Sequence, residues 1–297
     1  MKTILKGTGV ALITPFRRYG TVDFNSLNRL IENVIDNGVD FLVVMGTTGE
    51  AATLSEDERN AIISFTVENV NKRLPIVLGV GGNNTQHIVD VLKSDGFNGV
   101  DAILSVAPYY NKPGQKGIYS HYKAIAAASH LPVILYNVPG RTSVNIEADT
   151  CLKLANDFDN IIGIKEASGN ISQCMQILKN RPKDFLLFSG DDLLTYPLMA
   201  LGADGVISVV ANALPKQFSD MVNLMLKKNY NDALKIHYKL IDFINLLFVE
   251  GNPAGVKAAL EILGLINNNL RLPLTKVSKL TYSNLSNSIK EILDSEK

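Results

Sequence analysis

The chain of 297 residues is long enough for one large barrel or for two ordinary domains, because an α/β barrel commonly fills about 250 residues. Its composition, 46% hydrophobic and 20% charged with 22 Gly and 11 Pro, is that of a globular protein and excludes a disordered or fibrous chain. The 29 basic and 29 acidic side chains cancel, and no run of Lys or Arg forms a stripe that could track phosphates. We therefore expect no nucleic-acid partner.

The N-terminal segment MKTILKGTGV has no continuous apolar run, and no stretch reaches the roughly 18 apolar residues of a membrane helix. We expect a cytoplasmic protein that does not associate with membranes. Cys151 and Cys174 lie in segments with helical patterning and show no CxxC or Cys/His spacing. Both are expected to be reduced packing residues, because disulfides are rare in the cytosol.

Eight short segments rich in aliphatic and β-branched residues recur along the chain, and each predicts a buried strand. Their apolar character is nearly continuous, which is typical of parallel strands covered on both faces. The segments are VALITPF (10–16), FLVVMG (41–46), IVLGVG (76–81), AILSVAP (102–108), VILYNVP (133–139), IIGIKEA (161–167), LLFSGDD (186–192) and GVISVVAN (205–212).

Segments with helical periodicity lie between these strands. The first begins at Phe24, with Asp23 as its N-cap and Gly38 just past its end. The next opens on Ser55 with Glu58 three residues later, which is the spacing of a capping box. Eight alternating strands predict an α/β fold of the (β/α)8 TIM barrel type, because a doubly wound open sheet usually stops at about five or six strands.

After Leu214 the strand pattern ends, and amphipathic helices follow at 230–250 and 253–265. We expect residues 1–229 to form the catalytic barrel. Residues 230–297 are expected to form a C-terminal helical extension that packs on it.

The active site of such a barrel lies at the C-terminal ends of its strands. Polar, aromatic and charged residues gather at these ends of the predicted strands. They occur in GTTGE (46–50), PYYNKP (108–113), YNVPGRT (136–142), GIKEASG (163–169) and SGDD (189–192).

Lys165 is the most informative of these residues, because it follows the apolar run IIGI in a strand predicted to be buried. Burying an ammonium group costs several kcal/mol unless the group is paired or neutral. Desolvation favours the neutral amine, which is the form that attacks a ketone to make an imine. The pattern therefore indicates a Schiff-base lysine; the alternative is a lysine that reaches solvent or pairs with Glu166.

Tyr136 and the Thr47–Thr48 pair lie at the ends of predicted strands that can face each other across a barrel. A phenol beside hydroxyl groups can pass protons while an imine forms and breaks, although a buried structural tyrosine would show the same pattern. Arg141 follows a Pro-Gly turn and presents a planar fork suited to a substrate carboxylate, unless it is merely solvated.

No metal or cofactor is expected. Asp191 and Asp192 have no histidine or third carboxylate at ligand spacing, and GVGGNN (79–84) lacks the third glycine of a dinucleotide fingerprint. The histidines are scattered, and we expect helix-surface or capping roles for His87, His121, His130 and His237.

The joint order of these motifs resembles the dihydrodipicolinate synthase (4-hydroxy-tetrahydrodipicolinate synthase) family of the N-acetylneuraminate lyase superfamily. The resemblance covers essentially the whole chain and continues through FVEGNP (248–253) and LRLP (270–273). It implies a Schiff-base lyase of the class I aldolase type that works without a cofactor. Such an enzyme condenses pyruvate with L-aspartate 4-semialdehyde on the diaminopimelate route to lysine.

The resemblance also implies roles for single residues. Lys165 is similar to the imine-forming lysine, Tyr136 to the tyrosine that relays protons to it, and Thr47 to the hydroxyl that links two tyrosines. Tyr110 resembles the tyrosine that enters the neighbouring subunit's site, which implies a homodimer or homotetramer. The implied substrate-binding residues are Thr48 for the pyruvate carboxylate, Gly190 and Ile207 for the pyruvate pocket, and Arg141 for the carboxylate of the aldehyde.

Arg141 separates this reaction from those of sibling families. Sialic-acid lyases share the lysine, the tyrosine and a GxTGE loop but do not typically carry the Pro-Gly-Arg-Thr found at 139–142. A charged fork favours an aldehyde with a carboxylate over a neutral sugar. An N-acetylneuraminate lyase or 2-keto-3-deoxy sugar acid aldolase remains the first alternative, and a non-catalytic barrel that binds a keto acid the second.

Members of the family that are inhibited by lysine bind it with a Ser-Ala pair, two histidines, an asparagine, a glutamate and a tyrosine. Three of these positions fit here, at Ala52, Asn83 and Tyr109. Four do not, because Ala51, Glu56 and Arg59 stand in place of the serine and the histidines, and His87 in place of the glutamate. The effector's ammonium group would lose its carboxylate partner, so we expect weak or absent inhibition by lysine.

Overall fold

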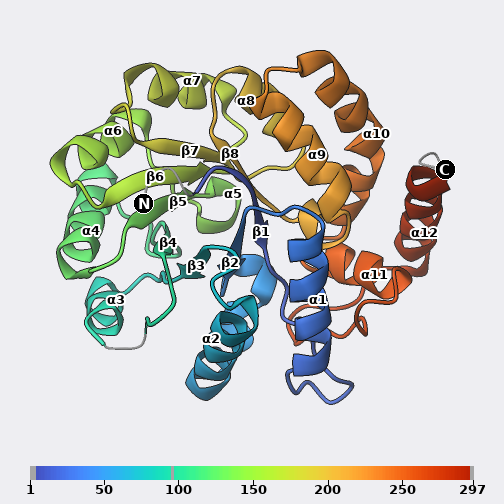
Figure 1. The fold of residues 1–297 in the computed structure, drawn as a ribbon. Coiled ribbons are helices and arrows are strands. Elements are labelled where there is room, and N and C mark those ends of the chain that lie inside the picture. Colours follow the sequence, from blue (N-terminus) through green and yellow to red (C-terminus); the bar gives the residue numbers. More distant parts are fainter. Residues whose placement is uncertain (1–4, 95–96, 295–297) are drawn as a thin grey trace. The chain divides into compact units, whose positions relative to one another are not determined.

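A computed structural model describes residues 5–94 and 97–294 of the chain. Its eight strands follow one another in chain order around a closed parallel barrel, which confirms the predicted (β/α)8 class (Figure 1). The strands are β1 (Gly7–Ala11), β2 (Phe41–Val44), β3 (Ile76–Gly79), β4 (Ala102–Val106), β5 (Val133–Asn137), β6 (Ile161–Glu166), β7 (Leu186–Ser189) and β8 (Gly205–Ser208).

Helices follow the strands, and short 3-10 turns accompany two of the strand ends. The helices are α1 (Phe24–Asp36), α2 (Glu56–Val70), α3 (Thr85–Leu92), α4 (Gln115–Ala128), α5 (Pro139–Thr142), α6 (Ala148–Asp157), α7 (Ile171–Asn180), α8 (Thr195–Ala200), α9 (Pro215–Leu226), α10 (Tyr230–Phe248), α11 (Ala254–Ile262) and α12 (Lys279–Asp294). The 3-10 turns are η2 (Thr47–Gly49), η3 (Ala51–Thr53) and η4 (Val210–Asn212).

The predicted caps are confirmed. The Asp23 side chain accepts a hydrogen bond from the N–H of Ser26 at the start of α1. Ser55 and Glu58 form the reciprocal capping box that opens α2. Both caps satisfy backbone N–H groups that the first turn of a helix leaves without partners.

The first strand lies earlier in the chain than predicted, at residues 7–11 instead of 10–16. Leu12 still donates from its N–H to Val43 O, but the N–H of Ile13 donates to the Asn212 side chain, so the strand ladder stops there. The other strands also end before the predicted limits. Sequence patterns place strand ends least reliably.

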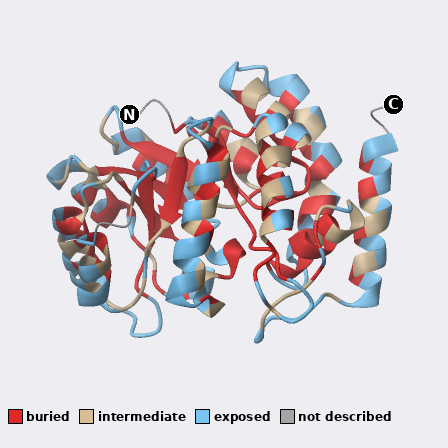
Figure 2. Ribbon diagram, turned by 60° about the horizontal axis from the view of Figure 1, so that its bottom comes forward, coloured by how far each residue is buried: buried red, intermediate tan, exposed pale blue. Residues whose placement is uncertain are grey.

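The strands are buried along almost their whole length, whereas the helices alternate buried and exposed faces (Figure 2). The continuous apolar strand segments predicted this burial. In the part of the chain that the structure describes, no helix combines the length and the apolar character needed to cross a bilayer.

The chain forms two compact units. Within the described residues, one consists of residues 5–6 and 75–207, and the other of residues 7–74 and 208–294. In the second unit, α10 packs against α9, α11 and α12, and α9 packs against β1 and η4. The division expected between residues 229 and 230 stays a prediction.

The expected surface positions of the histidines were wrong for His121 and His237, which are 4% and 6% exposed. His121 lies on the buried face of α4, in a helical stripe with Ile118, Tyr122 and Ile125. Its Nδ1 lies 2.8 Å from Thr85 Oγ1, and its buried Nε2 has no hydrogen-bond partner. Burial lowers the pKa of His121 to about 4.

His121 should make the protein sensitive to mild acid. Its pKa is about 6.5 when the chain is unfolded and about 4 when it is folded, so between these values the unfolded chain binds more protons. The free energy of unfolding should therefore fall by up to roughly 3 kcal/mol as the pH decreases from 6.5 to 4. Urea unfolding should show a smaller difference in the free energy of unfolding between pH 7 and pH 5 for His121→Gln than for the parent protein. Equal differences would show that His121 is not the source of the acid sensitivity.

Candidate active site

Lys165 and Tyr136 lie side by side on neighbouring strands. The register of β5 and β6 pairs the two residues directly, and their side chains are 6% and 7% exposed. Lys165 Nζ lies 4.4 Å from the centroid of the Tyr136 ring, so the amine is in contact with the ring. The two residues that the sequence predicts as nucleophile and proton relay thus lie in contact in a buried place.

Gly190 provides the space beside the lysine. It directly follows β7, and its N–H donates to Glu166 O at 2.8 Å. A Cβ atom at this position would lie 2.7 Å from the Cβ of Ala167 and 3.0 Å from Lys165 Cε. A side chain here would therefore push against the Lys165 stem, which gives a packing reason for a glycine beside a reacting amine.

Ile207 also lies in a buried strand, at 1% exposure on β8. Its neighbour Val206 pairs with Ser189 of β7, the residue that precedes Gly190. The expected wall of the pyruvate pocket therefore comes from neighbouring strand ends of one unit.

Glu166 does not pair with Lys165. The carboxylate is 2% exposed and accepts hydrogen bonds from Asn137, Gln173 and the N–H of Ser168. This excludes the alternative in which Lys165 is an ordinary strand-end lysine paired with the next residue. The sequence pattern singled out neither Asn137, although it lies within the segment 136–142, nor Gln173, because an amide in or near a site segment is too common to carry a signal.

Arg141 and Tyr110 lie at the surface. Arg141 occupies the four-residue helix α5 directly after β5, and it is exposed. Tyr110 is 89% exposed and has a φ of 74°, a left-handed conformation that bulky residues seldom adopt. An aromatic ring held outward at a conformational cost is suited to contact with another molecule.

Thr47 and Thr48 begin the turn η2 of the other unit. Thr47 is exposed, whereas Thr48 is 3% exposed and its Oγ1 accepts a hydrogen bond from Asn252 Nδ2 at 2.9 Å. The carbonyl of Gly49 accepts a hydrogen bond from Thr14 Oγ1 at 2.7 Å. The Thr48 oxygen is thus an acceptor toward Asn252, which leaves its own O–H to donate in another direction.

A buried ion pair holds the end of this turn. Glu50 has a left-handed backbone, with φ 52°, and its Oε1 lies 2.5 Å from Lys257 Nζ. Both side chains are fully buried, and Lys257 Nζ also donates to Asn269 O at 2.9 Å. Burial lowers the pKa of Lys257 to about 8, although the charge of Glu50 opposes that shift. The sequence pattern did not identify this pair, because the partners are separated by about two hundred residues.

The residues that could suggest other chemistry have structural roles. Asp191 Oδ1 accepts from the N–H groups of Leu193 and Leu194, which closes the turn after β7. Among the described residues no three His, Cys, Asp or Glu side chains gather at a metal-binding spacing. Cys151 and Cys174 are buried and unbridged, and burial followed by the charge of Glu166 raises the pKa of Cys174 to about 12.

Three comparisons relate the sequence and the fold to known proteins. Residues 4–292 match the family described as the dihydrodipicolinate synthetase family. The 4-hydroxy-tetrahydrodipicolinate synthase of Parabacteroides distasonis is 55% identical over 97% of both chains, and that of Phocaeicola vulgatus is 54% identical over 98% of both.

Solved structures give the same result for the fold. The dihydrodipicolinate synthase of Thermotoga maritima has a TM-score of 0.95 at 41% identity and covers 97% of this chain and 99% of its own. A chloride-inhibited dihydrodipicolinate synthase from Acinetobacter baumannii, solved in complex with pyruvate, has a TM-score of 0.94 at 43% identity with the same coverage. A structure described as the first monomeric variant of the enzyme has a TM-score of 0.95 at 41% identity, with 98% of each chain covered.

Proposed function

The chain belongs to the dihydrodipicolinate synthetase family, and from this premise we propose the reaction and the residues that carry it out. It is an aldolase-type lyase with the activity of a 4-hydroxy-tetrahydrodipicolinate synthase in the diaminopimelate route to lysine. Its substrates are pyruvate and L-aspartate 4-semialdehyde. The observation that supports the chemistry is the buried amine of Lys165 against the Tyr136 ring.

The reaction begins at Lys165. Its neutral amine attacks the keto carbon of pyruvate, and loss of water gives a protonated imine. The imine nitrogen accepts the electrons of the methyl C–H bond when that proton leaves, so an enamine forms without a cofactor. The enamine carbon then attacks the aldehyde carbon of the second substrate. The aldehyde oxygen becomes an alkoxide, which takes up a proton to give a hydroxyl group.

Release regenerates the lysine. The amino group of the condensed product attacks the imine carbon, closes the ring and expels the Lys165 amine. Tyr136 shuttles the protons that the carbinolamine gains and loses, because its ring already lies against Lys165. Thr47 and Tyr110 extend this relay, with Tyr110 supplied by a second copy of the chain.

Substrate binding falls to four further residues. Thr48 donates a hydrogen bond from its hydroxyl to the pyruvate carboxylate. The hydrogen bond that this hydroxyl accepts from Asn252 holds it in place. Gly190 and Ile207 shape the pyruvate pocket, and Arg141 binds the carboxylate of the aldehyde through its planar fork. Because Tyr110 is an outward-facing aromatic residue, we propose a homodimer or homotetramer in the cytoplasm.

A coupled assay tests the proposed reaction. The purified protein should consume pyruvate and aspartate semialdehyde together, and borohydride should trap pyruvate on the protein. Adding aspartate semialdehyde before borohydride should consume the enamine and so deplete the pyruvate adduct that borohydride can reduce, whereas N-acetylmannosamine should not. Depletion by the sugar alone would point to a sialic-acid lyase, and trapping without turnover of either aldehyde would point to a binding-only barrel.

Arg141→Ala should separate the two substrates. We expect KM for aspartate semialdehyde to rise about 100-fold, because a charged, bidentate contact is lost. The rate of borohydride trapping with pyruvate alone should change less than two-fold. Arg141→Lys keeps the charge without the planar fork, so its KM for aspartate semialdehyde should lie between those of the parent protein and Arg141→Ala. Equal losses for both substrates would contradict the role in aldehyde recognition.

Weak or absent inhibition by lysine stays part of the proposal. Arg59 donates to Ala51 O at 2.8 Å, so the guanidinium has a structural use where the family pattern has a histidine. Asn83 donates to Tyr109 O at 3.2 Å. His87 is exposed and brings no carboxylate to receive an ammonium group.

A further inference from the structure

Glu166 is a buried carboxylate that the proposed chemistry does not use. None of the ion pairs among the described residues involves it. Four hydrogen-bond contacts reach it from neutral donors: Asn137 Nδ2 at 3.1 and 3.0 Å, Ser168 N at 2.8 Å and Gln173 Nε2 at 2.8 Å. Because a buried anion without a cation is unfavourable compared with a neutral side chain, stability alone is a poor reason to keep this carboxylate.

The position of Glu166 couples it to the reacting lysine through the strands. Tyr136 pairs with Lys165 across β5 and β6, and the next residues, Asn137 and Glu166, pair in the same register. Successive side chains of a strand point to opposite faces. The two pairs therefore lie back to back on the same strand ends, and the outer pair fixes the backbone from which the inner pair projects.

The same network reaches the segment that carries Arg141. Asn137 Nδ2 also donates to Asn145 Oδ1 at 2.8 Å, and its Oδ1 accepts from the N–H of Ile146 at 2.9 Å. Gln173 Oε1 accepts from Asn145 Nδ2 at 2.8 Å. Since Arg141 lies between Asn137 and Asn145 in the chain, its segment is clamped to the Glu166 cluster at both ends.

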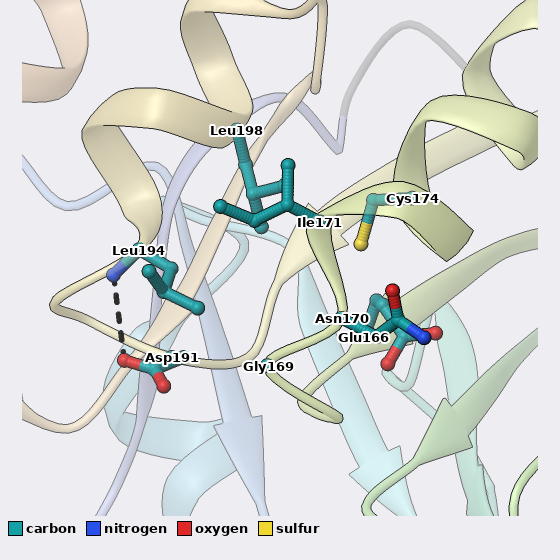
Figure 3. A pocket seen from close by; sticks show the side chains of 8 residues that line it. All are labelled: Glu166, Gly169, Asn170, Ile171, Cys174, Asp191, Leu194 and Leu198. Carbon is teal, nitrogen blue, oxygen red and sulfur yellow. Dashed lines mark hydrogen bonds between the residues drawn. The ribbon is translucent and has the colours of Figure 1, made fainter.

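The carboxylate is shielded from solvent, because Glu166 is 2% exposed. Figure 3 shows it at the edge of a narrow pocket lined by Cys174, by apolar side chains and by two polar residues. The apolar side chains are Ile171, Leu194 and Leu198, and the polar residues are Asn170 and Asp191. In such a low-dielectric place hydrogen bonds to a charged group are strong and directional, so they fix the positions of their donors.

We propose that Glu166 is a positioning residue that holds the Lys165–Tyr136 pair and the Arg141 segment in one arrangement. The inference rests on the proposed function. Glu166 does not touch the substrates. Its negative charge accepts hydrogen bonds from three polar groups, at the end of β5, in the loop after β6 and on α7. Through these groups it fixes the distance between Lys165, where the imine forms, and Arg141, which binds the aldehyde.

Glu166→Gln tests this inference, because the amide keeps the shape but turns one acceptor into a donor. Whichever oxygen becomes NH2 would face two donors, since Oε1 and Oε2 each accept twice. The rate of imine trapping with pyruvate and borohydride should fall at least ten-fold, and KM for aspartate semialdehyde should rise at least ten-fold. The double variant E166Q/Q173E returns a carboxylate to the cluster and should recover part of both losses.

Two further variants keep the test decisive. Asn229→Ala removes the side-chain N-cap of α10, which has no bond to the Glu166 cluster, so it should lower the melting temperature while leaving both kinetic values within two-fold. Gln173→Met serves if Glu166→Gln does not fold; it breaks the bond to Glu166 and should raise the aldehyde KM more than it slows trapping. Folded Glu166→Gln or Gln173→Met protein with both values within two-fold of the parent overturns the inference. Absence of a pyruvate adduct on the parent protein would instead overturn the proposed function.

Discussion

Replacing Lys165 with alanine should abolish the trapping of pyruvate by borohydride and lower kcat on the order of 10⁴-fold or more. The reason is that the amine is the only group proposed to form a covalent bond with the substrate, and the electron sink of the reaction disappears with it. The fold should survive, because the side chain lies against Tyr136 and none of the ion pairs among the described residues involves Lys165. Mass spectrometry of the reduced protein gives the direct measurement.

Two other lysines serve as controls for this experiment. Lys153 is on the surface in an ion pair with Asp157, and Lys153→Ala should keep the adduct and the rate. Lys257 is the other buried lysine among the described residues, and Glu50 occupies its Nζ. An adduct of parental intensity on Lys165→Ala, or a peptide labelled at Lys257, would show that the nucleophile is elsewhere.

Much of the barrel could be predicted, because the information lies in local patterns. Continuous apolar segments indicated the eight strands, and the caps Asp23 and Ser55 indicated where helices begin. The strand ends were less predictable. Ile13 leaves the ladder because its N–H bonds to Asn212, about two hundred residues away, and no local pattern contains that contact.

In the candidate site, too, features with a local sequence pattern could be predicted, and features that depend on contacts distant in sequence could not. Lys165 could be chosen from sequence because an ammonium group in an apolar strand is a local anomaly, and the structure places Tyr136 beside it. The supporting polar groups could not be chosen. Asn137 and Gln173 matter through their bonds to Glu166, and amides are too frequent in loops and helices for their type to reveal those bonds.

Breaking the ion pair between Lys257 and Glu50 should have the second large effect, a loss of stability. Lys257→Met should lower the free energy of unfolding by about 3–5 kcal/mol, because it leaves the Glu50 carboxylate buried without its cation. The backbone conformation of Glu50 adds to the effect: a left-handed residue is retained only when its surroundings hold it. Urea unfolding at constant pH measures the change, and the pyruvate KM should rise because Thr47 and Thr48 precede Glu50 in the same turn.

Matched variants distinguish a lost ion pair from a lost side chain. Lys235→Met on α10 removes an exposed pair with Asp232 and should change stability by no more than about 0.5 kcal/mol. Adding Glu50→Gln to Lys257→Met removes the stranded charge and should recover a large part of the loss, since replacing both partners is often tolerated. If the double variant were as unstable as the sum of the two single changes, the contact of Lys257 Nζ with the Phe16 ring, 4.2 Å from its centroid, and not the pairing with Glu50, would be the source of the stability.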